Sequence, residues 1–405
     1  FSSGMMEVAR KGIFHPENFF FSEIMIIFLA VMLTDVILLD IFNTLGLPTS
    51  TTVSIVFELL GSAVAVALVK INRLGQSVGD LNTYINSGKA LAIISGILLS
   101  VVISFTVGII VMYLARLIFT FNYKKTFKYF GAVWGGFAIT AIIYFILVKG
   151  AKGSSFISDA SSEWIKNNSA LIMLYSFIGW TILLQLLYWL IKIDILKLIV
   201  MVGTFALAMA FAGNDLVNFI GVPLAGLKSY QSFMADPAAD PNGFVMVALT
   251  EKAKANTYLL LIAGLVMVIT LWLSRKARRV TETEVNLSRQ GAGVERFGSS
   301  MLSRTIVRSA IDISKSFGKF TPKSLKKSIN KRFDSSEYQK SIKGKKDAPS
   351  FDLVRASVNL TVASILISLA TSMKLPLSTT YVTFMVAMGS SLADKAWGRE
   401  SAVYR

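Results

Sequence analysis

FAGNDLVNFIGVPLAG, residues 211–226, lies inside a long apolar run that begins at Lys197. Such a run is typical of a membrane-spanning helix, yet it holds the carboxylate of Asp215 between the amides of Asn214 and Asn218. On a helix these three side chains share one face, because they are three and four positions apart. An ionisable group and two amides are costly in hydrocarbon unless they face an ion, a polar ligand or water. The stretch therefore predicts a binding site for something small and charged near the middle of the membrane.

The same stretch is rich in residues that interrupt helices. Proline and glycine are tolerated in membrane helices where neighbouring groups satisfy the freed backbone atoms, or where the backbone lines a cavity. We therefore expect a broken helix here, with free backbone groups beside the polar side chains. The residues concerned are Gly213, Gly221, Pro223 and Gly226.

A second motif occurs twice. Residues 45–52 read LGLPTSTT and residues 373–380 read MKLPLSTT, each after a long apolar segment and before a shorter one. Proline at a helix start, followed by hydroxyl groups, gives an N-terminus with free N–H groups and a positive dipole end, which is a ready anion site. Ordinary N-capping is the alternative explanation of the hydroxyls. The candidate phosphate-binding residues are Ser50, Thr51, Thr52, Ser378, Thr379 and Thr380.

Composition fixes the class of protein. Of the 405 residues, 54% are hydrophobic, which is typical of a polytopic membrane protein rather than a soluble domain. Cysteine is absent and His15 is the single histidine, so disulfides, thiol chemistry and histidine-based metal or catalytic sites are excluded. We therefore expect a protein that is not an enzyme, with no cofactor.

The net charge of +17 is concentrated in one loop. Residues 275–347 hold 19 Lys and Arg against 7 Asp and Glu. The positive-inside bias of membrane proteins explains such a loop without nucleic acid, and places residues 275–350 in the cytoplasm. Contact with anionic lipid headgroups is a secondary interpretation.

The order of the segments predicts an all-α polytopic membrane protein built from an inverted repeat, with broken or re-entrant helices. Paired interrupted helices in two halves are the sequence signature of such secondary transporters. Both ends of the chain look cut. If Arg10 and Lys11 correspond to residues 275–279, the first half should begin with its own Asn-Asp-x-x-Asn helix upstream of Phe1. The expected parts are 1–71, the end of a first repeat with a Pro-x-Ser-Thr-Thr hairpin; 72–195, connecting transmembrane helices; 196–274, the start of the second repeat; 275–350, the basic loop; and 351–405, the second hairpin.

These motifs, taken together and in this order, resemble those of the inorganic phosphate transporter (PiT) family, whose members are sodium- or proton-coupled phosphate symporters. Residues 212–218 are similar to the family's Gly-Ala-Asn-Asp-x-x-Asn, with Ala and Gly exchanged, and residues 48–52 and 376–380 match its Pro-x-Ser-Thr-Thr. The family has a histidine after the threonines. Val53 and Tyr381 stand there in this chain, which leaves the coupling ion open.

The resemblance implies a cation-coordinating role for Asp215, and carboxylate oxygen suits a hard cation. Because Asn214 and Asn218 share a face with Asp215, we expect both amides at the phosphate and Asn214 also at the sodium ion. The two amides are otherwise explained as hydrogen-bonding links between helices. Asp40 and Asn43 share a helix face and form a further candidate sodium site, with simple helix packing as the alternative.

Two more carboxylates, Asp35 and Glu58, lie in apolar segments. They are weaker candidates of the same kind.

A phosphate dianion alone would be prohibitively costly at the middle of a membrane. The motif segments hold no Lys or Arg except Lys374, so two helix N-termini and bound cations must supply the compensating charge. We therefore expect symport of inorganic phosphate with Na⁺ or H⁺ by alternating access. The alternatives are an anion channel without obligatory coupling and a membrane enzyme acting on a phosphorylated lipid. The expected partners are phosphate and the lipid bilayer but not nucleic acid, and a homo-oligomer stays open.

Overall fold

The computed structural model describes most of the chain, and the structural statements below refer to the described residues. They are residues 12–121, 123–144, 159–236, 238–250, 257–280, 323–334, 352–373 and 377–394, with isolated positions between 301 and 312. Lys374 and Pro376 of the second motif, and most of the basic loop 275–350, therefore lie outside the described residues.

Within the described residues the protein is helical, with two isolated β-bridges and no strand. Seven of these helices are long and apolar enough to cross a membrane, which confirms the predicted all-α polytopic membrane protein. They are α2 (Phe21–Leu45), α3 (Thr51–Arg73), α5 (Ser87–Ile118), α6 (Tyr123–Ile143), α8 (Ser169–Ile191), α9 (Ile195–Met234) and α15 (Leu353–Ser372). The other helices are α4 (Leu81–Tyr84), α7 (Asp159–Asn167), α10 (Thr257–Leu273), α13 (Lys323–Arg332) and α16 (Thr379–Ala393), with 3₁₀ turns η2 (Pro16–Asn18), η3 (Val78–Asp80) and η5 (Val247–Leu249).

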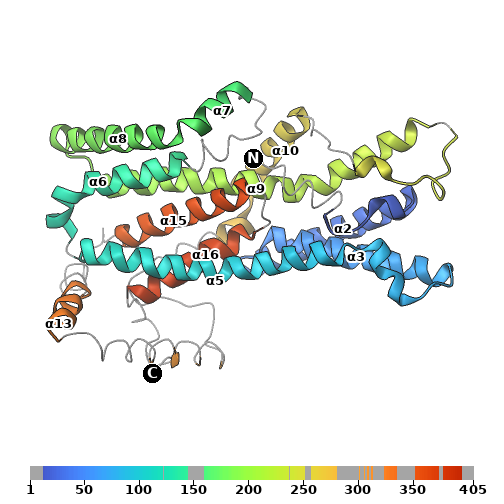
Figure 1. The fold of residues 1–405 in the computed structure, drawn as a ribbon, viewed down its shortest axis with the longest axis horizontal. Coiled ribbons are helices and arrows are strands. Elements are labelled where there is room, and N and C mark those ends of the chain that lie inside the picture. Colours follow the sequence, from blue (N-terminus) through green and yellow to red (C-terminus); the bar gives the residue numbers. More distant parts are fainter. Residues whose placement is uncertain are drawn as a thin grey trace.

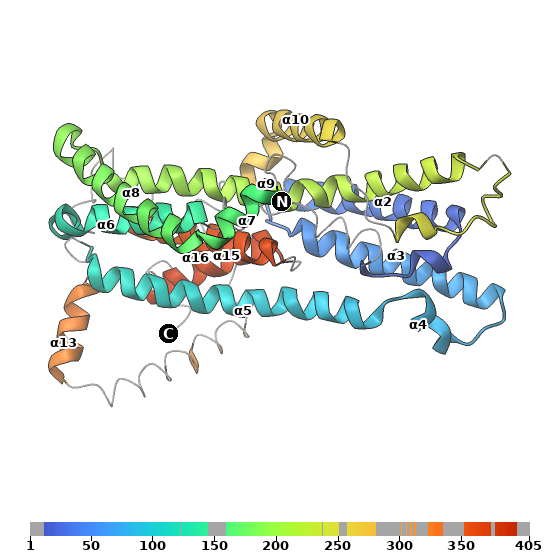
Figure 2. The same cartoon turned by 45° about the horizontal axis from the view of Figure 1, so that its top comes forward.

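The long helices α5 and α9 run along the length of the molecule, as Figures 1 and 2 show. They have 32 and 40 residues, and at about 1.5 Å per residue each exceeds the ~30 Å of a hydrocarbon core. The two helices form a frame on which the shorter helices pack.

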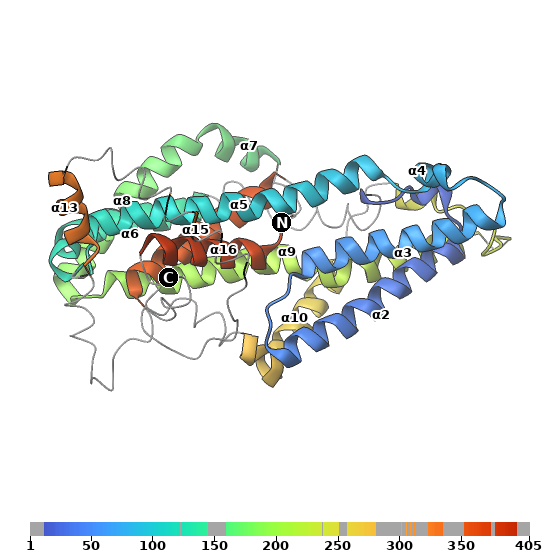
Figure 3. The same cartoon turned by 90° about the horizontal axis from the view of Figure 1, so that it is seen from below.

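Two helical hairpins lie beside α5 and α9, one in each half of the molecule. Helix α2 packs against α3 in one half of the molecule, and α15 packs against α16 in the other half, as Figure 3 shows. The tips meet near the middle, where the Thr380 hydroxyl donates to the Thr49 carbonyl oxygen at 3.0 Å. Helix α16 has 15 residues and at about 22 Å is too short to cross a bilayer alone.

Glycine allows α16 to lie very close to α5. A Cβ atom at Gly389 would collide with the carbonyl oxygen of Phe105, and one at Gly108 would stand 2.7 Å from that of Val386. Small residues at helix contacts let backbones approach in membranes, where packing rather than the hydrophobic effect drives association. The second hairpin is thereby fixed against α5.

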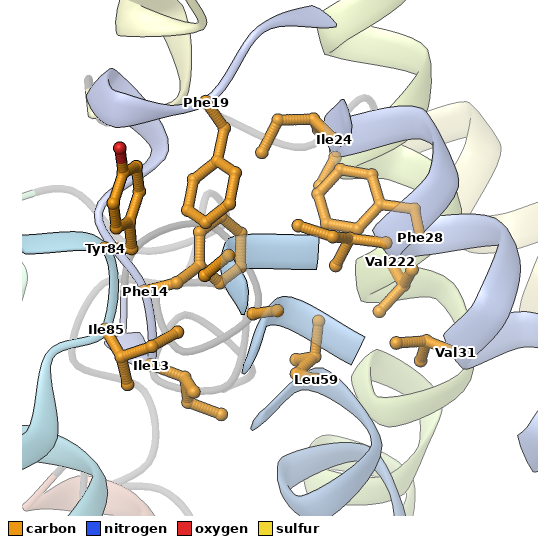
Figure 4. Packing of buried hydrophobic residues seen from close by; sticks show 14 of the residues in the cluster. Ile13, Phe14, Phe19, Ile24, Phe28, Val31, Leu59, Tyr84, Ile85 and Val222 are labelled. Atoms are coloured by element: carbon orange, nitrogen blue, oxygen red, sulfur yellow. The ribbon is translucent and has the colours of Figure 1, made fainter. Parts of the chain in front are cut away.

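The two ends of the molecule are held together by different contacts, a hydrophobic cluster at one end and buried ion pairs at the other. At the end beyond α2 and α3, aromatic and aliphatic side chains form a buried cluster that includes Phe14, Phe19 and Phe28 (Figure 4). At the opposite end, Arg116 of α5 and Arg355 of α15 are fully buried and both pair with Asp394, at 2.6 and 2.9 Å.

Much of the outer surface is apolar. Leu190 of α8 and Trp272 of α10 are 79% and 78% exposed. Large exposed apolar surfaces mark interaction with membranes or partners. With seven candidate spans, they identify an integral, multi-pass membrane protein.

The expected break in residues 211–226 is wrong. Helix α9 continues without interruption from Ile195 to Met234, with Pro223 inside it. Val222 and Ala225, on either side of the proline, are buried in contacts with neighbouring helices. These contacts stabilise the continuous helix. Neighbouring helices commonly compensate proline in this way in membranes.

Candidate functional site

Both Ser-Thr-Thr motifs converge on Asp215, near the middle of α9. Thr51 Oγ1, at the start of α3, donates to Asp215 Oδ1 at 3.3 Å. Thr379 Oγ1, at the start of α16, lies 3.1 Å from Oδ1 and 3.2 Å from Oδ2 of the same carboxylate. Three segments that are far apart in the sequence therefore form one polar cluster.

The two asparagines complete this cluster from the same face of α9. Asn214 Nδ2 donates to Thr52 Oγ1 at 3.0 Å and to Asp215 Oδ1 at 3.1 Å. Asn218 Nδ2 lies 2.9 Å from both Thr51 Oγ1 and Thr52 Oγ1. Asn218 is 1% exposed and its Oδ1 atom has no hydrogen-bond partner, so one buried acceptor stays unused.

The two serines act as helix caps. Ser50 Oγ accepts from the Val53 N–H at 3.2 Å, and Ser378 Oγ accepts from the Tyr381 N–H at 3.0 Å. Capping, the alternative raised for these hydroxyls, is therefore observed for both serines. The caps leave the first N–H groups of each helix without an acceptor inside the helix.

The electrostatics of the cluster are mixed. The N-termini of α3 and α16 carry the positive ends of two helix dipoles, which favour an anion. Asp215 is a full negative charge, and no Lys or Arg of the described residues pairs with it. The cluster therefore offers donors for an anion and, from Asp215 and Asn218 Oδ1, oxygens for a hard cation.

The structure does not bring Asp40 and Asn43 into this cluster. Asp40 is exposed and forms an ion pair of 2.6 Å with Lys276, just after α10. An exposed, paired carboxylate is satisfied without an added ion, and the sodium site at Asp40 and Asn43 stays a prediction.

Sequence reasoning missed Thr49, whose carbonyl oxygen joins the two tips. Its position is the variable one of Pro-x-Ser-Thr-Thr, so the side chain carries no signal. Among the described residues, no three His, Cys, Asp or Glu side chains gather as ligands for a metal ion.

Comparison with known proteins gives two matches. The family model described as the phosphate transporter family matches residues 1–284. Among solved structures, one titled "The sodium-dependent phosphate transporter" superposes with a TM-score of 0.65 at 16% identity, covering 100% of this chain and 79% of that one. A search of the curated proteins finds no match.

Proposed function

This chain belongs to the phosphate transporter family, and from that premise we propose that it moves inorganic phosphate across a membrane together with Na⁺. The proposal rests on the family and on the chemistry of the central cluster. The solved structure with the same fold is titled as sodium-dependent.

The convergence of two helix N-termini on Asp215 carries the proposal. Free N–H groups and the threonine hydroxyls at the starts of α3 and α16 would hold the phosphate oxygens. In the structure Thr51 and Thr379 donate to Asp215, so these donors would have to turn from the carboxylate to the phosphate. A cation on Asp215 would make that exchange favourable, because it replaces the donors and neutralises the carboxylate.

Coupling follows from this competition. Without a cation, the negative Asp215 repels phosphate and occupies its donors; with a cation, both effects are reversed. Binding of the two ions is therefore cooperative, and cooperativity between sites is reciprocal. This distinguishes a symporter from a channel, in which phosphate would pass without the cation.

Sodium suits the cluster better than a proton relay. The ligands at hand are carboxylate, amide and hydroxyl oxygens, which hard cations prefer. Val53 and Tyr381 follow the two motifs, so neither supplies an imidazole for proton transfer. Alternating access would then expose the cluster to each side in turn, with the basic loop 275–350 in the cytoplasm.

Uptake of radiolabelled phosphate into proteoliposomes tests the proposal. The full-length protein would be compared under an imposed Na⁺ gradient and an imposed pH gradient. We expect uptake with the Na⁺ gradient, and a loss of roughly tenfold or more in Asp215→Asn, because hydrogen bonds and ion contacts to a charged group contribute about 1.5–3 kcal/mol.

Glu163→Gln is the matched control, since this carboxylate is exposed on α7, away from the cluster. Its uptake should equal that of the wild type. Uptake that needs neither gradient and survives Asp215→Asn would indicate a channel, and uptake driven only by the pH gradient would indicate proton coupling.

A further inference from the structure

A second pair of carboxylates lies inside the α2–α3 hairpin, apart from Asp215. Asp35 of α2 is 8% exposed, and Glu58 of α3 is partly buried. The Ser54 hydroxyl donates to Glu58 Oε1 at 2.7 Å and also interacts with the Asp35 carboxylate. The two carboxylates are close enough to repel each other. Ser54 thus lies beside two carboxylates within a membrane-spanning hairpin.

Each carboxylate has an oxygen without a partner. Asp35 Oδ1 and Glu58 Oε2 are both buried and accept no hydrogen bond. Among the described residues, neither group pairs with Lys, Arg or His, and no cationic side chain interacts with either. A buried charge left uncompensated is strongly unfavourable, and ionisable groups in membrane segments are a default sign of function. The two buried oxygens are therefore acceptors that a bound cation could contact.

A cavity of about 660 Å³ lies beside this pair. Its wall on α3 is polar and presents Ser50, Ser54, Glu58 and Ser62, four positions apart on one face. The α2 wall is largely apolar. Glu58 is the one charged residue of the described lining, so the cavity attracts a cation and repels an anion.

The cavity also reaches the tips of the hairpins. Thr49 and Ser50 of the first tip and Tyr381 of α16 line it together with Glu58. The same cavity therefore connects Glu58 with the tips of the two hairpins.

We propose that Asp35, Ser54 and Glu58 form a second Na⁺ site, reached through the cavity between α2 and α3. The ligands are two carboxylate oxygens and one hydroxyl oxygen, a set that suits a hard monovalent cation. This site does not depend on phosphate binding at Asp215, and it is tested without phosphate.

Equilibrium binding of radiolabelled Na⁺ to the purified full-length protein in detergent, with choline as the replacing cation, tests the proposal. The wild type should bind one more Na⁺ per chain than Asp35→Asn or Glu58→Gln. Asp215→Asn should retain the Na⁺ that these two variants lose. Glu163→Gln, an exposed carboxylate on α7, should match the wild type.

Correct folding is checked by circular dichroism and by the Na⁺ that Asp215 still binds in the two hairpin variants. Ser54→Ala keeps both charges and should weaken Na⁺ binding at this site rather than abolish it. Equal Na⁺ numbers in the wild type and both hairpin variants would overturn the proposal. So would an unchanged Na⁺ number with altered proton binding, since the pair would then share a proton.

Discussion

The Thr380 hydroxyl donates a hydrogen bond of 3.0 Å to the carbonyl oxygen of Thr49, across 331 positions of sequence. This contact joins the tips of the two hairpins, and the neighbouring Thr51 and Thr379 both donate to Asp215. It places the two helix N-termini side by side, so that neither half of the molecule forms the cluster alone.

Thr380→Val removes this hydrogen bond and keeps the size of the side chain. We expect a loss of about 1 kcal/mol in stability, the usual contribution of one hydrogen bond, and weaker phosphate uptake. Thr383→Val is the matched control, because the Thr383 hydroxyl donates to the Thr379 carbonyl oxygen within its own helix. Thermal unfolding in detergent measures the stability, and phosphate uptake is measured in proteoliposomes. Equal unfolding midpoints and equal uptake in the two variants would contradict a structural role for the Thr380–Thr49 hydrogen bond.

The hydroxyls at Asp215 give a second prediction. Thr51→Val and Thr379→Val each remove a donor to the carboxylate and should lower uptake by about 10- to 100-fold, since hydrogen bonds to charged groups contribute about 1.5–3 kcal/mol. Thr51→Ser and Thr379→Ser retain the hydroxyl and should keep most of the uptake. If valine and serine variants are equally active, the hydroxyls have no role.

The close contact of α5 and α16 predicts a size limit. Gly389→Ala would push a methyl group against the backbone of Phe105, which has no flexible end to move, and should destabilise the protein by about 1–3 kcal/mol. Gly96→Ala on α5 meets nothing within 4 Å and should leave stability unchanged or raise it. Thermal unfolding distinguishes the two variants, and equal unfolding midpoints would contradict the close packing of α16 against α5.

The buried ion pairs at the end of α5 predict a large effect. Asp394→Asn leaves the guanidinium groups of Arg116 and Arg355 without their shared carboxylate and should cost about 3–5 kcal/mol. Asp40→Asn breaks the exposed pair with Lys276 and should cost less than about 1 kcal/mol. Asp40→Asn should also leave phosphate uptake unchanged; a loss of uptake would restore Asp40 as a site residue.

Local pattern predicted much of this fold. Apolar runs predicted the spans, and the shorter apolar segment expected after the second motif agrees with α16. The repeated Leu-Pro-x-Ser-Thr-Thr predicted two helix starts, because proline followed by hydroxyls has one strong local preference. Asn214, Asp215 and Asn218 share a face as their spacing required.

Tertiary packing decided the rest. Pro223 does not break α9, since neighbouring helices hold the chain on both sides of it. The distance from Asp35 to Glu58 depends on how α2 folds back on α3, and no spacing in the sequence encodes it. The same holds for Arg116, whose partner Asp394 is 278 positions away.

Binding of radiolabelled phosphate to the purified full-length protein, in Na⁺ and in an equal concentration of K⁺, tests the central claim most directly. Competition for the donors at Asp215 predicts binding in Na⁺, little in K⁺, and none in Asp215→Asn under either condition. Phosphate binding of equal strength in Na⁺ and K⁺ that persists in Asp215→Asn would contradict it.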